Sequence, residues 1–131
     1  MTDEELIAAF ETGALPAQQF SHTEHVRVAW WYLSHASLPA ALGRFSTSLR
    51  RFAAAKGAVG KYHETVTVMW ILVIADRLDA ARGLSWPDFA AANPDLLARS
   101  PSPLSRYYSD EVLFSERARR TFVLPDRVTR E

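Results

Sequence analysis

The sequence contains no cysteine, and this absence excludes several kinds of chemistry together. Disulfide bonds, iron–sulfur clusters, thiolate zinc sites and cysteine nucleophiles all require that residue. An excess of charge of one sign is also missing, because fifteen basic and fifteen acidic side chains cancel. No long-range electric field would therefore draw the protein toward nucleic acid or an anionic membrane surface. We expect neither of them as a partner.

Long hydrophobic runs are scarce as well. The longest run, VTVMWILVIA, spans about ten residues, which is about half of what a transmembrane helix needs. The first residues, MTDEELIAAF, are acidic and amphipathic and lack the basic start and the apolar stretch of a signal peptide. We therefore expect a cytoplasmic protein.

The composition that remains is that of an ordinary folded chain. Apolar residues make up 48% of the sequence and charged residues 23%, unlike the low hydrophobicity and high charge of disordered proteins. A length of 131 residues is typical of one domain and is enough to bury a core. We expect a single domain over residues 1–131.

The spacing of apolar residues predicts helices as the main elements. Ser21 and Glu24 have the three-residue separation of a capping box, which predicts that a helix begins at His22. Prolines and glycines mark where the helical patterns end. On this basis we expect four main helices, at residues 4–12, 22–35, 39–56 and 62–82.

Beyond Gly83 the pattern changes to short segments. Polar residues that can cap a helix stand before each of them, namely Ser85, Asn93, Ser102 and Ser115. We expect these segments to form short helices packed over the main ones. The predicted fold class is therefore all-α, a compact bundle of about four main helices with short C-terminal helices.

Histidines give the sequence its most concentrated chemistry. His22 and His25 are three residues apart, so on a helix they project from one face. Ala29 and Tyr32 continue that face and would form a wall behind the imidazoles. His35 lies at the other end of this helix, where it suits the helix dipole, and we leave it out of the site.

A third histidine, His63, opens the most apolar helix and is expected to point inward. If the two helices are neighbours, His22, His25 and His63 would form a three-nitrogen set that can hold iron, copper or zinc with a position left open. Glu64 is the candidate general base or fourth ligand. Tyr32 and Tyr62 are further candidates for catalytic or supporting roles.

A structural role for the same histidines is the alternative, because a histidine beside an apolar face is often a core or capping residue. His22 and His25 lie at a helix N-terminus, where the helix dipole disfavours a cationic imidazole. The dipole therefore favours the neutral imidazole, which is the form that binds metal. Both the structural and the metal-binding interpretation stay open.

The strings FSHTEHVRVAW and KYHETVTVMW, followed by YYS, LFSERAR and FVLPD, resemble a family of small, uncharacterised bacterial helical proteins. Its motifs are F-x-H-x-x-H-V-R and K-Y-H-E-T, and the resemblance covers residues 20–126. It implies a compact helical fold in which His22, His25, His63 and Glu64 are the most recognisable polar positions. It implies no activity.

Three functional hypotheses follow. The first is a metal-dependent enzyme of the oxygenase or lyase type that acts on a small molecule, with a mononuclear iron, copper or zinc site. The second is a metal-free isomerase or lyase in which His25 or His63 does the acid-base work. The third is a helical protein without enzymatic activity that binds a small molecule or forms a homodimer, with the histidines as caps and core.

Overall fold

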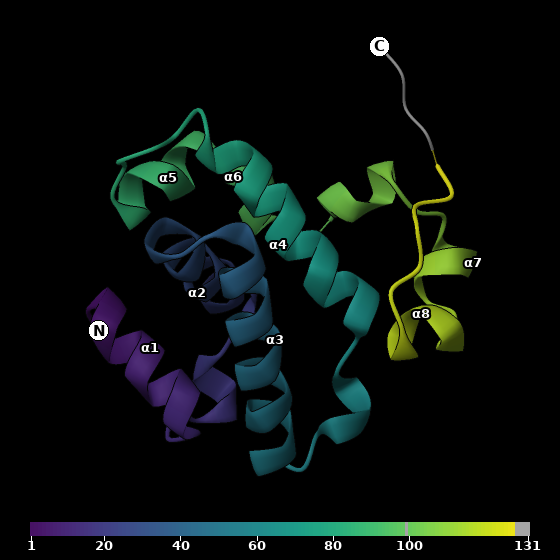
Figure 1. The fold of residues 1–131 in the computed structure, drawn as a ribbon, viewed down its shortest axis with the longest axis horizontal. Coiled ribbons are helices and arrows are strands. Elements are labelled where there is room, and N and C mark those ends of the chain that lie inside the picture. Colours follow the sequence, from purple (N-terminus) through teal and green to yellow (C-terminus); the bar gives the residue numbers. More distant parts are fainter. Residues whose placement is uncertain (99, 128–131) are drawn as a thin grey trace.

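In the computed structural model, residues 1–98 and 100–127 are described, and their regular secondary structure is entirely helical (Figure 1). The predicted all-α class is confirmed. The longer helices are α1 (Asp3–Thr12), α2 (His22–His35), α3 (Leu38–Ala55), α4 (Glu64–Leu78) and α5 (Trp86–Ala92). The shorter ones are η1 (Ala17–Gln19), η2 (Val59–Lys61), α6 (Pro94–Leu97), η3 (Pro103–Arg106), α7 (Asp110–Leu113) and α8 (Glu116–Arg120).

Helix α4 occupies the centre of this arrangement. It packs against α2, α3 and α8, while α1 packs against α2 and α3 on the far side (Figure 1). Ile71 and Ile74 of α4 are fully buried, and Phe10 of α1 is 1% exposed. Burial of such side chains drives the folding of the bundle. None of the helices within the described ranges combines the length and apolar character needed to cross a membrane.

The start of α2 follows the prediction. Glu24 accepts a hydrogen bond from the Ser21 amide at 3.1 Å, and the Ser21 side chain accepts one from the Glu24 amide. This reciprocal pair satisfies two of the free amides at the helix N-terminus. Helix α2 therefore begins at His22 and ends at His35, as the sequence predicts.

The short C-terminal helices are capped as predicted at three positions. Ser85, Ser102 and Ser115 each accept a hydrogen bond from a backbone amide two or three residues later. Asn93 precedes α6 but does not cap it with its side chain. Its carboxamide instead donates to the Phe89 carbonyl at 3.0 Å and accepts from Arg77 at 3.0 Å.

The predicted limits of the fourth helix, 62–82, are wrong at both ends. His63 has an extended backbone, with φ −129° and ψ 110°, and caps α4, which begins at Glu64. The helix ends at Leu78, and residues 79–83 form turns that close at Gly83, whose φ is +86°. Glycine adopts this left-handed conformation at little cost. The first turn of α4 thus lies two residues further along the chain than expected.

Candidate functional site

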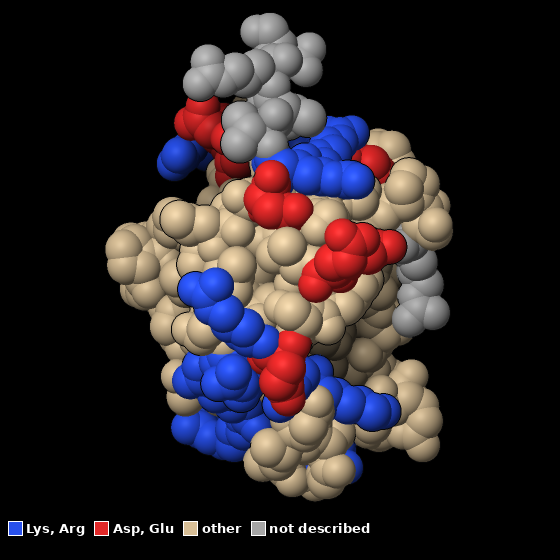
Figure 2. All heavy atoms as spheres, turned by 90° about the vertical axis from the view of Figure 1, so that its right-hand side faces the viewer, with Lys and Arg blue, Asp and Glu red and all other residues tan. Residues whose placement is uncertain are grey.

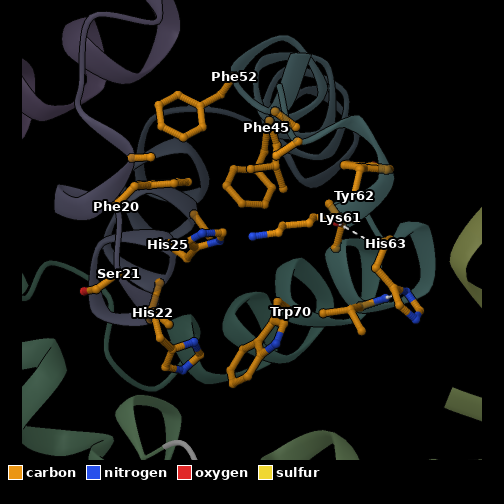
Figure 3. Close-up of a pocket in the computed structure, with 18 of the residues that line it drawn as sticks. Phe20, Ser21, His22, His25, Phe45, Phe52, Lys61, Tyr62, His63 and Trp70 are labelled. Carbon is orange, nitrogen blue, oxygen red and sulfur yellow. Dashed lines mark hydrogen bonds between the residues drawn. The ribbon is translucent and has the colours of Figure 1, made fainter. Parts of the chain in front are cut away.

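A cavity of about 510 Å³ lies between α2, α3, η2 and α4 (Figure 3). Its walls are mainly apolar, and five aromatic rings contribute to them: those of Phe20, Phe45, Phe52, Tyr62 and Trp70. The described residues that line it include no aspartate or glutamate. The volume falls in the range of small-molecule sites, roughly 300–1,000 Å³. The cavity therefore suits a small, mainly apolar molecule.

His25 is the imidazole that faces this cavity. Its ring stacks on that of Phe20, with the ring centres 3.9 Å apart and an angle of 22° between the planes. Unlike His22 and His63, it forms no hydrogen bond with any residue of the described ranges. One ring nitrogen of a neutral imidazole donates a hydrogen bond and the other accepts one, so His25 has both a donor and an acceptor that no described residue uses.

Burial and the nearby His22 lower the pKa of His25 from 6.5 to about 4, and the negative charge of Glu24 only partly opposes this. Burial acts in this direction because it disfavours the charged imidazolium. At neutral pH, His25 is therefore an uncharged imidazole.

His22 also lines the cavity, but one of its nitrogens is already engaged. Its Nε2 lies 2.8 Å from the carbonyl oxygen of Leu96 in α6. Because a carbonyl oxygen only accepts hydrogen bonds, Nε2 is the donor of this bond. The ring stands edge-on to Trp70, with the centres 5.0 Å apart. His22 thus joins α2 to α6 and to α4.

His63 belongs to the lining of the cavity, but its ring does not point into the cavity as expected (Figure 3). Its Nδ1 accepts a hydrogen bond from the Val66 amide at 3.2 Å, and its Nε2 donates to the Leu113 carbonyl at 2.7 Å. Figure 3 shows the ring directed away from the cavity. The helix face that was predicted to continue from His63 does line the cavity. It comprises Thr67, Trp70 and Ile74. The difference arises because His63 precedes the helix, so helical geometry does not set the direction of its side chain.

The three histidines therefore do not converge on one point in this structure. Both ring nitrogens of His63 have partners, and one nitrogen of His22 has one. Within the described ranges, no group of three or more His, Cys, Asp or Glu side chains is placed to hold a metal ion. As they are placed here, these side chains do not fit a three-histidine centre.

Glu64 and Tyr62 form a pair beside the cavity. Glu64 accepts a hydrogen bond from the Tyr62 hydroxyl at 2.7 Å and forms an ion pair with Arg50 at 2.9 Å. Burial, followed by the hydrogen bond to Glu64, raises the pKa of Tyr62 to about 12. Tyr62 lines the cavity, whereas Glu64 does not. This carboxylate is thus committed to Arg50 and Tyr62.

Tyr32 lies outside the cavity lining, although Ala29 on the same face belongs to it. The Tyr32 hydroxyl donates to Glu11, which also forms an ion pair with Arg44 at 2.7 Å. Phe45 packs edge-on against Tyr32, with the ring centres 6.2 Å apart, and lines the cavity in its place. Tyr32 therefore connects α2 to α1 and α3.

Two cationic residues at the cavity, Lys56 and Lys61, were not among the predicted site residues. They are the only lysines in the sequence, and they flank the glycines at positions 57 and 60. Lys61 also stands two residues before His63 in the string KYHET. Two signals could have identified these lysines: lysine is rare in this sequence, and Lys61 lies beside that motif.

Comparisons of the chain with protein-family models, with curated proteins and with solved structures gave no match. The resemblance to a bacterial family stays a prediction, and the function has to be inferred from the residues of the cavity.

Proposed function

We propose that the cavity binds a small, mainly apolar molecule, and that His25, without a metal ion, is the group that forms a hydrogen bond with this molecule and exchanges a proton with it. One observation carries the proposal. The imidazole of His25 has no hydrogen-bond partner among the described residues and lies at a cavity with aromatic walls. His22 and His63, by contrast, are bound to backbone carbonyls.

The corresponding chemistry is proton transfer. A neutral imidazole can accept a proton from one atom of a bound molecule and return it to another, which is the step that isomerases and lyases require. The mainly apolar walls lower the local dielectric constant, so electrostatic interactions within the cavity are stronger than in bulk solvent. A bound molecule with negative charge would raise the pKa of His25 toward neutrality and make the imidazole a better base.

The test uses the neutral fluorescent probe N-phenyl-1-naphthylamine, whose emission rises in apolar surroundings. Ala53 lines the cavity, whereas its neighbour Ala54 is exposed and does not. Ala53→Trp should fill part of the cavity, and Ala54→Trp is the matched control on the same helix. We expect saturable binding by the wild type and by Ala54→Trp, and at least tenfold weaker binding by Ala53→Trp. Circular dichroism confirms that each variant is folded.

Two results would contradict this proposal: no saturable binding by the wild type, or equal binding by the two tryptophan variants. The first result would favour the hypothesis of a helical protein that forms a homodimer without a small ligand. Sedimentation of the wild-type chain would then determine its oligomeric state.

A metal-dependent enzyme is the second candidate, and one observation favours it. His22 and His25 lie one turn apart on α2, and both line the cavity. A three-histidine centre would require His63 to leave the Leu113 carbonyl and the Val66 amide, at the cost of two hydrogen bonds. Elemental analysis of the chain for iron, copper and zinc separates this candidate from the first.

A further inference from the structure

Both lysines of the chain line the same cavity. Lys56 is the C-cap of α3, and Lys61 is the last residue of η2. Gly57, with φ +67°, makes the left-handed turn between them, and the Lys61 amide donates to the Ala58 carbonyl at 2.9 Å. The loop between α3 and α4 is thus folded so that two cationic side chains reach an otherwise apolar space.

The two amines differ in what they contact. Lys56 Nζ donates to the Gly13 carbonyl at 3.0 Å and lies 5.4 Å from the centre of the Phe52 ring. Lys61 Nζ forms no hydrogen bond or ion pair with a residue in the described ranges. Figure 3 shows its side chain extending into the cavity, with the amine directed toward His25. Lys61 therefore presents a charged donor to the cavity beside a neutral imidazole.

Two carboxylates on the helices that border the cavity are already engaged with other groups. Glu64 is paired with Arg50 and Tyr62, and Glu24 accepts the Ser21 amide in the capping box. Since no described lining residue is acidic, the cavity has a positive group without an anionic partner. A positive charge in partly apolar surroundings is stabilised most by an anion that also has an apolar part, because that part can pack against the apolar walls.

Building on the proposed function, we infer that the ligand of this cavity is a small organic acid. Its apolar body packs against the aromatic walls, and its single carboxylate binds Lys61 Nζ. The neutral imidazole of His25 is a second donor to the same group. Hydrogen bonds between a charged donor and a carboxylate are about twice as strong as neutral ones, so this group fixes the orientation of the ligand.

The surface charge agrees with an anionic ligand. Lysine and arginine side chains predominate in the lower part of the face shown in Figure 2. In Figure 1 the lower end of the molecule carries the end of α3 and the loop that contains η2. A local excess of positive charge raises the concentration of anions near such a surface, although the chain as a whole is neutral.

The test compares two isosteric compounds, 2-naphthoate and 2-naphthamide, which differ in charge and not in shape. Isothermal titration calorimetry measures the binding of each directly, to the wild type and to Lys61→Met and Lys61→Arg. Arg82→Met is the matched control, because its side chain is 82% exposed and lies outside the cavity lining. Lys61 is itself exposed, so these variants should fold, and circular dichroism checks this.

We expect the wild type to bind the naphthoate about tenfold more tightly than the amide, as one charge-assisted hydrogen bond predicts. Lys61→Met should abolish this preference and leave amide binding unchanged, while Lys61→Arg and Arg82→Met should keep it. Equal binding of the two compounds by the wild type, or an unchanged preference in Lys61→Met, overturns the inference. If neither compound binds but N-phenyl-1-naphthylamine does, the inference fails and the proposed function stands. If none of the three binds, both fail.

Discussion

The imidazole of His25 lies against the ring of Phe20, with 3.9 Å between the ring centres, at the wall of the cavity. This stacking uses the face of the imidazole. The two ring nitrogens, which lie at its edge, have no hydrogen-bond partner among the described residues. The contact explains how an uncharged histidine is held in place without a hydrogen bond, since flat rings at this separation gain dispersion energy and lose water.

The lowered pKa of His25 predicts a specific dependence of stability on pH. The pKa is about 4 in the folded chain and 6.5 when unperturbed, so the unfolded state binds the proton first as the pH falls. Stability should therefore decrease between about pH 6.5 and pH 4, by on the order of 2 to 3 kcal/mol from this residue. Urea unfolding of wild type and His25→Gln at several pH values measures the contribution as the difference between the two curves. Identical pH dependence of both proteins would contradict the prediction.

His63 should behave as a structural residue that stabilises the start of α4. His63→Ala removes the cap on the Val66 amide and the bond to the Leu113 carbonyl. We expect a loss of about 2 kcal/mol in the free energy of unfolding, from one cap and one further hydrogen bond. His63→Asn can keep the cap but is too short to reach Leu113, so it should recover about half of the loss.

His35→Ala is the matched control for this experiment, because His35 is exposed at the end of α2 and, among the described residues, its ring contacts only Trp31 in the same helix, through its carbonyl at 2.7 Å and its ring. Its effect should stay below about 1 kcal/mol. If His63→Ala were as stable as the wild type while binding of N-phenyl-1-naphthylamine was lost, His63 would be a binding residue and not a cap.

Local signals were sufficient to predict most of the helices. The start of α2 is determined by Ser21 and Glu24, three residues apart, and its end is constrained by the nearby Pro39. Both signals act within a few residues, so they can be recognised in the sequence. The helix that begins at His22 therefore has the predicted limits.

The site was harder to predict because its partners are distant along the chain. The Leu113 carbonyl that binds His63 is 50 residues away, and the Leu96 carbonyl that binds His22 is 74 residues away. No periodicity in the sequence reveals such pairs. The sequence therefore indicated that the histidines lie near the apolar face that follows His63. It did not indicate which of the three imidazoles has no hydrogen-bond partner.

Thr65 should contribute more to stability than its neighbour Thr67. Thr65 is fully buried, and its hydroxyl donates to the Ala118 carbonyl at 2.7 Å and accepts from the Val123 amide at 3.1 Å. Thr65→Val leaves these groups without a partner, which should cost about 2 to 3 kcal/mol. Thr67→Val is the matched control, because its hydroxyl donates only to the His63 carbonyl, which also accepts the Thr67 amide.

Thermal and urea unfolding of the two valine variants measure this difference. We expect Thr67→Val to cost less than about 1 kcal/mol, since it leaves no backbone group unsatisfied. Equal losses in the two variants would show that the link between α4 and α8 through Thr65 contributes little to the fold.

Metal content distinguishes the two candidate functions. If His25 acts without a metal, elemental analysis of the untagged chain should find iron, copper and zinc far below one equivalent after incubation with each metal and desalting. A variant with both His22→Ala and His63→Ala should give the same result. This expectation follows from His63, whose two ring nitrogens are bound to a carbonyl and an amide group and would have to release them to complete a three-histidine site. Near-stoichiometric metal in the wild type, lost in the double variant, would show that the histidines rearrange around an ion. The metal-dependent enzyme would then replace our proposal, and the element found would decide between redox and Lewis-acid chemistry.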